Sequence, residues 1–217
     1  MKKIAVILSG CGYKDGSEIT ESISVLVALS ELGVQYEIFA PDLDVETTDH
    51  LSENSTNNKR NILHEAARIA RGQVKDIKSL NPDHYEALAM PGGFGAALHL
   101  CDFAVKGSKA SVHPEVRRVV ESFYRSSKPI GAACIAPAVL ALVLGSKGVT
   151  LTVGEKGEAS AEIEKTGAHH ELCAVDNFVT DREHKVVTTP AYMYDDAKPH
   201  LVFKGIRLAM QELCEMA

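Results

Sequence analysis

The sequence predicts an α/β protein in which helices cover both faces of a mostly parallel central sheet. Two observations lead to this fold class. Short apolar runs typical of buried strands alternate along the chain with segments of helical periodicity, and turns rich in glycine or alanine follow several of those runs. The chain has 217 residues, 45% of them hydrophobic, and shows no internal repeat or linker. We therefore expect residues 1–217 to form a single domain.

The first strand and the first helix are expected before Gly33. The apolar run within 3–9 predicts a buried strand. It follows two lysines and precedes Leu-Ser-Gly-Cys, as in a lipoprotein signal, but it is shorter than the ~7–15 residues of an apolar signal core. Residues 18–32 predict a helix that Gly33 ends. Its expected apolar face consists of Ile19, Ile23, Leu26, Val27 and Ser30.

The middle of the chain continues the alternation. Residues 34–40 alternate like a strand, whereas 42–58 are polar and predict a surface loop. The elements expected next are a helix at 60–72, a strand that starts near Tyr85 and runs into a glycine-rich turn, and a helix at 113–127 with Pro114 in its first turn.

The last third of the chain begins with a strand at 129–133, which leads through Cys134 into a helix ending near Leu144. The remaining expected elements are strands at 149–153 and 175–180, a helix near 158–166, a hairpin within 179–189 and a helix from about Asp195 to Glu215. In such sheets, sites form at the carboxyl ends of the strands. Three sharp junctions compete for that role, at 9–12, 90–95 and 133–135.

Composition narrows the function classes. Lysine and arginine number 23 against 29 acidic residues, a net charge of −6, and aromatic residues make up only 6%. We therefore expect neither nucleic acid nor a membrane as partner, and no stretch approaches membrane-spanning length. The five cysteines are scattered and form no CxxC pair, which favours neither a disulfide framework nor a zinc ribbon and suggests a reducing, cytoplasmic location.

The stretch KPIGAACIAPAVLALVLG, residues 128–145, carries the strongest candidate nucleophile. Ala132 and Ala136 lie two residues before and after Cys134, as a tight strand-to-helix elbow requires. Such an elbow places sulfur at a helix N-terminus, which favours thiolate, and offers the Ile135 N–H as an oxyanion donor. The alternative is a cysteine that only packs as a small apolar residue between strand and helix.

The stretch MPGGFGAA forms a second candidate feature. Gly92, Gly93 and Gly95 leave the backbone bare directly after a strand, where its N–H groups can face a developing oxyanion. The stretch is neither a P-loop nor a GxGxxG motif. A plain tight turn is the alternative interpretation.

These motifs resemble a known family. The elbow cysteine, the PGG turn and the acidic helix after the first strand resemble the ThiJ/PfpI superfamily, which implies a flavodoxin-like, class I glutamine amidotransferase-like three-layer sandwich. The motifs SGCG..DGSEI.E, RN.L.EAARI.RG, PGGFGAA, CIAPA and TTPAYM together resemble its ElbB branch, also called the enhancing-lycopene-biosynthesis or ES1-like proteins. This resemblance covers nearly the whole chain.

The resemblance implies roles for four residues. Cys134 falls on the nucleophile, and Glu21 on the acidic residue that contacts its sulfur. Gly93 and Ile135 fall on the backbone oxyanion donors. A carboxyl group beside a thiolate has a raised pKa, so a proton shared by Glu21 and Cys134 is expected. Without the resemblance, Glu21 would be interpreted as a solvated helix residue.

Further residues lie in family motifs or near the elbow. Gly92, Cys11, Gly12 and Asn61 are expected in loops that line the pocket. Many members place a histidine soon after the elbow helix, but this chain has none there, and His170 is the substitute candidate. Glutamine amidotransferases pair their cysteine with a later His-x-Glu. The HPE at 113–115 precedes Cys134 and is explained by a helix start, and no four-ligand metal spacing occurs.

The resemblance also implies an activity. The branch is assigned a cofactor-independent glyoxalase reaction on small dicarbonyls, above all glyoxal, which becomes glycolate; repair of glycated protein has been proposed as well. We expect the reaction to need no cofactor. We also expect the chain to form a homodimer. Two alternatives stay open: a redox-sensing Cys134, or a non-catalytic binding protein linked to isoprenoid metabolism.

Overall fold

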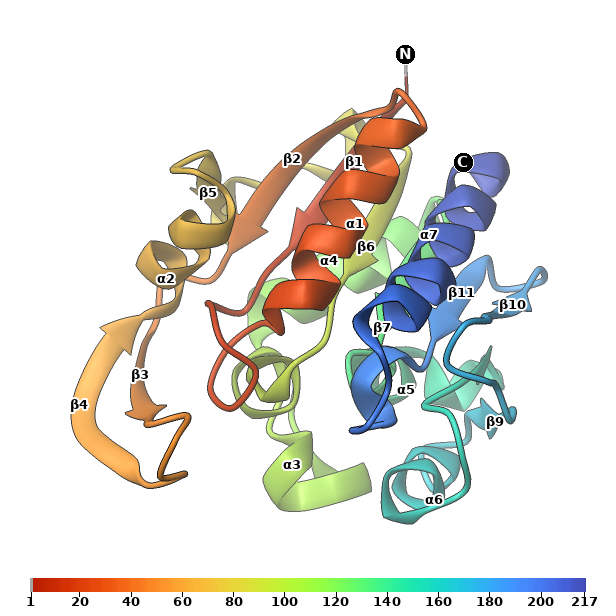
Figure 1. Ribbon diagram of the computed structural model, residues 1–217. Coiled ribbons are helices and arrows are strands. Elements are labelled where there is room, and N and C mark those ends of the chain that lie inside the picture. The colour runs from red at the N-terminus through yellow and green to blue at the C-terminus, as the bar shows by residue number, and fades with distance from the viewer. Residues whose placement is uncertain (1) are drawn as a thin grey trace.

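The computed structural model describes residues 2–217 and confirms the α/β architecture, with a mostly parallel central sheet (Figure 1). The sheet has seven strands in the order β10-β11-β7-β6-β1-β2-β5. Every neighbouring pair is parallel except the hairpin of β10 and β11. The strands are β1 (Lys3–Ile7), β2 (Gln35–Ala40), β5 (Val74–Asp76), β6 (Ala87–Met90), β7 (Ile130–Ala133), β10 (Val179–Asp181) and β11 (Val186–Thr189).

Helices cover both faces of this sheet, which accounts for the unbroken apolar run of β1. Successive strand residues point to opposite faces. Ala5 and Ile7 join one buried cluster, and Ile4, Val6 and Leu8 join the other. A strand buried on both faces therefore has no position for a polar side chain.

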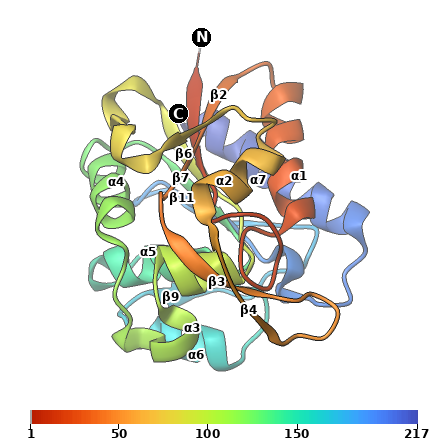
Figure 2. The ribbon, with the colours of Figure 1, turned by 90° about the vertical axis from the view of Figure 1, so that its left-hand side faces the viewer.

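Each layer is built from helices whose apolar faces pack on the sheet. One layer contains α1 (Ile19–Glu31), α2 (Ile62–Ile69) and α7 (Pro199–Met216), and the other contains α4 (Pro114–Arg125), α5 (Pro137–Leu144) and α6 (Glu158–Glu164). Figure 2 shows α4 and α5 on one side of the strands and α1 and α7 on the other. Among the described residues, no helix combines the length and the apolarity needed to cross a membrane.

The prediction of which face of α1 is buried is wrong. Ile19, Ile23 and Val27 are 49%, 42% and 40% exposed. The buried face consists of Glu21, Ser22, Ser24, Val25, Ala28 and Leu29. Both faces have helical periodicity, and three polar residues on the inner face made the outer face look more apolar.

The polar segment predicted as a loop forms a hairpin of β3 (Asp44–Thr48) and β4 (Ser55–Asn61), which lies beyond the main sheet (Figure 1). Because it is not part of the main sheet, its strands need no apolar alternation. Two further short elements that the sequence did not predict are α3 (Phe103–Lys106) and β9 (His169–His170), which pairs with β8 (Thr150–Leu151). The others are a π-helix, η3 (Ala96–Leu100), and the short 3₁₀ helices η1 (Ile77–Ser79), η2 (Pro82–His84), η4 (Gly107–Lys109), η5 (Gly145–Lys147) and η6 (Ala191–Met193).

Candidate active site

The strand–turn–helix elbow predicted around Cys134 is present. Cys134 follows β7 directly and has φ of +57°, a left-handed conformation that is strained for a residue with a side chain. Its N–H donates to the Thr189 carbonyl oxygen at 2.9 Å, which fixes the turn to β11. Ala132 and Ala136 are buried, so larger side chains have no room beside the turn. The elbow holds the thiol at the carboxyl edge of the sheet.

Glu21 meets this thiol from the first turn of α1. The helix begins there because the Glu18 carboxylate accepts a hydrogen bond from the Glu21 N–H at 2.6 Å. The Glu21 side chain is fully buried; it accepts from the N–H of Gly92 at 2.8 Å and of Tyr192 at 3.1 Å, and it is hydrogen-bonded to Cys134. Two backbone donors and one thiol therefore surround one carboxyl group.

The two side chains compete for one proton near neutral pH. Burial, and after it the charge of Glu18, raises the pKa of Glu21 to about 7, although the backbone donors at Tyr192 and Gly92 oppose this. Burial and the charge of Glu21 also raise the pKa of the Cys134 thiol. The N–H groups of Gly93 and Ile135 favour the thiolate, but they do not outweigh burial. Because the pKa of the thiol is raised further above that of Glu21, the proton of the singly protonated pair rests on sulfur, and a thiolate requires transfer of that proton to Glu21.

The glycine-rich turn is shaped by close backbone contacts. A Cβ on Gly92 would lie 2.4 Å from the Cys134 Cβ. Gly93 has φ of +91°, and a Cβ there would lie 2.4 Å from the Glu18 nitrogen. The Glu18 N–H donates to the Gly92 carbonyl at 3.0 Å and joins the turn to α1. Glycine is required at both positions because the elbow and α1 approach so closely.

The loop after β1 borders the cavity through Tyr13 and Lys14, whereas Cys11 and Gly12, which were expected to line it, do not. Gly12 has φ of +112°, and the His50 ring from the hairpin packs where a Cβ would be. The neighbouring Tyr13 carbonyl accepts from the Phe94 N–H at 2.6 Å. Cys11 lines a small void beside Glu65 instead, and burial raises the pKa of its thiol.

Asn61 and His170 lie outside the cavity next to Cys134. The Asn61 side chain caps α2 by accepting from the His64 N–H at 3.2 Å, and its amide donates to Asp42 and Asp44. His170 lies on β9 with Nε2 buried and without a hydrogen-bond partner among the described residues. Neither side chain meets the thiol.

The His113–Glu115 motif is a helix start, as the sequence predicted. The His113 side chain accepts from the Glu115 N–H at 3.3 Å, and Pro114 is the first residue of α4. Within residues 2–217, no group of three or more His, Cys, Asp or Glu side chains could hold a metal ion.

A cavity of about 1130 Å³ opens onto the thiol. Its lining includes Glu18, Gly93, Phe94, Cys134, Ile135 and Tyr192. Sequence reasoning singled out neither Glu18 nor Tyr192 as a site residue. Glu18 was identified only as the first residue of a predicted helix. Tyr192 lay in the TTPAYM motif but acts through its backbone, which no residue-type pattern reveals.

A buried glutamate against an elbow cysteine, on this sheet, defines a ThiJ/PfpI-type protein with a class I glutamine amidotransferase-like fold. The chain is 40% identical over 225 residues to human glutamine amidotransferase-like class 1 domain-containing protein 3, mitochondrial, covering 99% of this chain and 83% of that protein. It is 31% identical to zebrafish ES1 protein, mitochondrial, over 98% of this chain and 85% of that one. The chain belongs to this ES1 family of glutamine amidotransferase-like proteins.

A solved structure agrees over the full length. An isoprenoid biosynthesis protein with an amidotransferase-like domain from Ehrlichia chaffeensis is 34% identical and has a TM-score of 0.93, covering 100% of this chain and 99% of that chain. Drosophila melanogaster DJ-1beta, at 17% identity, a TM-score of 0.55 and coverage of 100% and 95%, shares the fold. No family model matches the chain.

The cytoplasmic location expected from the cysteines is contradicted by these relatives. The human and zebrafish proteins and a rat ES1 protein homolog are all named as mitochondrial. The cysteines are free thiols, as the sequence suggested. Reduced thiols reflect the redox state around a protein and do not specify one compartment, so the scattered cysteines do not support a cytoplasmic location.

Proposed function

We propose that the protein is a cofactor-independent glyoxalase that converts glyoxal and related small dicarbonyls to hydroxy acids. The observation that carries the proposal is the hydrogen-bonded pair of Glu21 and Cys134 beside a cavity, with two backbone N–H groups directed at the sulfur. A nucleophile, one proton carrier and oxyanion donors are the groups that this reaction needs.

The reaction begins with transfer of the Cys134 thiol proton to Glu21. The thiolate adds to one aldehyde carbon of glyoxal, and Glu21 gives its proton to the resulting oxyanion, which yields a hemithioacetal and leaves Glu21 as a carboxylate. The N–H groups of Gly93 and Ile135 are close enough to the sulfur to stabilise the oxyanion of this step.

Glu21 then moves a proton between the two carbons. It removes the proton from the sulfur-bearing carbon to give an enediol and delivers a proton to the neighbouring carbon, which leaves a glycolyl thioester on Cys134. Water hydrolyses the thioester to glycolate and restores the thiol. Glyoxal and one water thus give glycolate without net oxidation. A carboxyl group with a pKa of about 7 suits both directions of transfer at neutral pH.

The test is glycolate formation from glyoxal in the absence of glutathione. Cys134→Ser is expected to reduce the rate to background, and Glu21→Gln to reduce it by about 10²-fold or more. Cys214→Ser is the matched control, because Cys214 has the same 7% exposure but lies on α7. Glycolate formation no faster than that of Cys134→Ser would refute the proposal.

Removal of glyoxal adducts from protein amino groups is a related activity that would use the same pair. Incubation of a glycated peptide with the protein and with Cys134→Ser distinguishes it. If adducts are lost faster than free glyoxal is converted to glycolate, repair is the main reaction. If adduct loss only follows the removal of free glyoxal, the glyoxalase reaction is the main one.

The Ehrlichia chaffeensis protein is named as an isoprenoid biosynthesis protein, so a second candidate for this chain is a role in isoprenoid metabolism. If that role is non-catalytic, it does not require the Cys134 thiol. Restoration of isoprenoid yield in a deletion strain by Cys134→Ser as fully as by the parent chain would support it. A redox-sensing role is less well supported. Sensor thiols are exposed and have a low pKa, whereas Cys134 is buried and its pKa is raised.

A further inference from the structure

The cavity beside Cys134 is much larger than glyoxal requires. Pockets of roughly 300–1,000 Å³ hold drug-sized ligands, and this one measures about 1130 Å³. A dicarbonyl as small as glyoxal would touch only the floor. The residues that line the rest of the cavity therefore indicate which larger substrate would fit.

One wall is apolar. Phe94 from the glycine-rich turn is 50% exposed, and Val105 from α3 is 75% exposed. Phe103 from α3 contributes beside them. Large apolar side chains left open to solvent at a site mark a surface that an apolar ligand covers.

Acidic side chains also line the cavity. Glu158, at the first turn of α6, and Asp195 line it, and neither forms a hydrogen bond or ion pair with another described residue. The two cavity lysines are already paired, Lys14 with Glu53 at 2.9 Å and Lys106 with Asp102 at 2.5 Å. The unpaired side-chain charge that a ligand would meet in the cavity is therefore negative.

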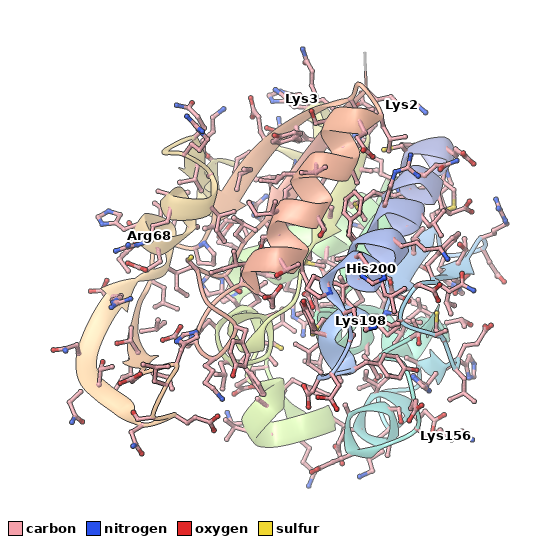
Figure 3. The ribbon with its side chains drawn as sticks, viewed as in Figure 1. Lys2, Lys3, Arg68, Lys156, Lys198 and His200 are labelled. Carbon is pink, nitrogen blue, oxygen red and sulfur yellow. The ribbon has the colours of Figure 1, made fainter. Side chains whose placement is uncertain are left out.

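Two nearby cations do not cancel this charge. Figure 3 shows Lys156 beside α6 and Lys198 at the start of α7. Neither lines the cavity. The wall formed by Tyr13 and Glu53 already holds an ammonium group: the Lys14 Nζ lies 4.8 Å from the centroid of the Tyr13 ring. Elsewhere in the cavity, an organic cation would meet the carboxylates of Glu158 and Asp195.

We propose that the preferred substrate is a small ketoaldehyde whose apolar body carries a cationic group. The aldehyde carbon meets Cys134, the apolar body lies along Phe94 and Val105, and the cation faces Glu158 and Asp195. This proposal rests on the proposed glyoxalase function and adds the substrate class. The reaction keeps the same balance: ketoaldehyde and water give a 2-hydroxy acid.

Three phenylglyoxals test the charge preference: unsubstituted, para-trimethylammonio and para-carboxy. The measured quantity is kcat/KM for formation of the corresponding mandelate. We expect the cationic compound to exceed the anionic one by about 10-fold or more at low ionic strength and by less at high salt. Equal values, or a preference for the anion, would overturn the proposal.

Variants separate the cavity from the general negative charge of the protein. Glu158→Gln combined with Asp195→Asn is expected to reduce the cation-to-anion ratio about 4- to 10-fold. Glu164→Gln combined with Asp196→Asn removes the same charge from the same segments, at exposed residues that do not line the cavity, and is expected to leave the ratio within about 2-fold. Equal effects of the two pairs would show that only net charge matters and would refute the proposal.

Binding to Cys134→Ser keeps this inference separate from the glyoxalase proposal. The matching para-substituted acetophenones cannot undergo the reaction, and calorimetry gives their Kd. Tighter binding of the cation, lost in the double variant, supports the charge preference even if no mandelate forms. Formation of neither glycolate nor mandelate overturns the glyoxalase proposal, and no difference in Kd overturns this one.

Discussion

At the scale of single residues, the site depends on where one proton resides. Glu21 has no solvent contact, and its ionisation is opposed by burial and by Glu18. The Cys134 thiol is buried as well, and the charge of Glu21 opposes its ionisation. The pair therefore carries two protons in acid and one above about pH 7. Only the singly protonated pair can present a thiolate, with the proton on Glu21.

The first prediction concerns the pH dependence of catalysis. We expect kcat/KM for glyoxal to rise with pH through about 7, because the pair loses its second proton there. A pH–rate profile of the parent chain measures this. A profile that is flat between about pH 5.5 and 8.5 would contradict the assignment of the active form.

The second prediction concerns the contact of Gly92 with the elbow. Gly92→Ala is expected to lower the free energy of unfolding by about 1–3 kcal/mol and to reduce glycolate formation, because the new Cβ would overlap Cys134. Urea denaturation and the glyoxal assay measure both. Gly157→Ala is the control, since a Cβ there meets nothing within 4 Å. Equal stability losses in the two variants would show that the contact at Gly92 is not decisive.

At the scale of elements, local patterns identified most strands and helices, and burial decided the rest. The apolar run of β1 and the capped helix α4 were predictable because their signals lie within a few residues. The hairpin of β3 and β4 was not, because its polar residues are held by contacts distant in sequence. The Thr48 N–H donates to the Asp15 carboxylate at 2.6 Å.

The third prediction concerns this hairpin. Asp15→Ala is expected to speed amide hydrogen exchange within 44–61 and to leave exchange in β1 and β6 unchanged, because the hairpin lies outside the main sheet. Exchange measured by mass spectrometry tests it. Asp83→Ala, a change at an exposed turn residue, serves as the control. Faster exchange throughout the central sheet would mean that Asp15 supports the whole fold.

At the scale of the whole molecule, the buried carboxyl group of Glu21 lowers stability above acid pH. Its folded pKa of about 7 exceeds the ordinary value of 4.5, so the folded state holds a proton that the unfolded state has lost between these values. The contribution of Glu21 to the free energy of unfolding is therefore greatest below pH 4.5 and falls as the pH rises toward 7.

The fourth prediction follows from that sign. Between pH 5.5 and 7.5, the free energy of unfolding of the parent chain, minus that of Glu21→Gln, should fall by about 2 kcal/mol. Urea denaturation of both chains at the two pH values measures it, and the difference removes the contribution of other titrating groups. A difference that stays constant would mean that Glu21 is not protonated in the folded state.

The fifth prediction is the homodimer that the family resemblance implies. Sedimentation equilibrium should give twice the mass of one chain at micromolar concentration. In the single chain, Ile19, Ile23 and Val27 form an exposed apolar stripe on α1. The mass of a single chain over the whole concentration range would contradict the prediction.

The sequence by itself determined the alternation of strands and helices, the elbow at Cys134 and the glycine-rich turn, because each depends on residues adjacent in the chain. Only the tertiary structure decided that Glu21 faces inward while the more apolar stripe of α1 faces solvent. It also decided that the Tyr192 N–H, 171 residues away, holds the carboxyl group. Strand order brings these distant residues to one sheet edge, and burial there sets their pKa values. Neither effect is encoded in local periodicity.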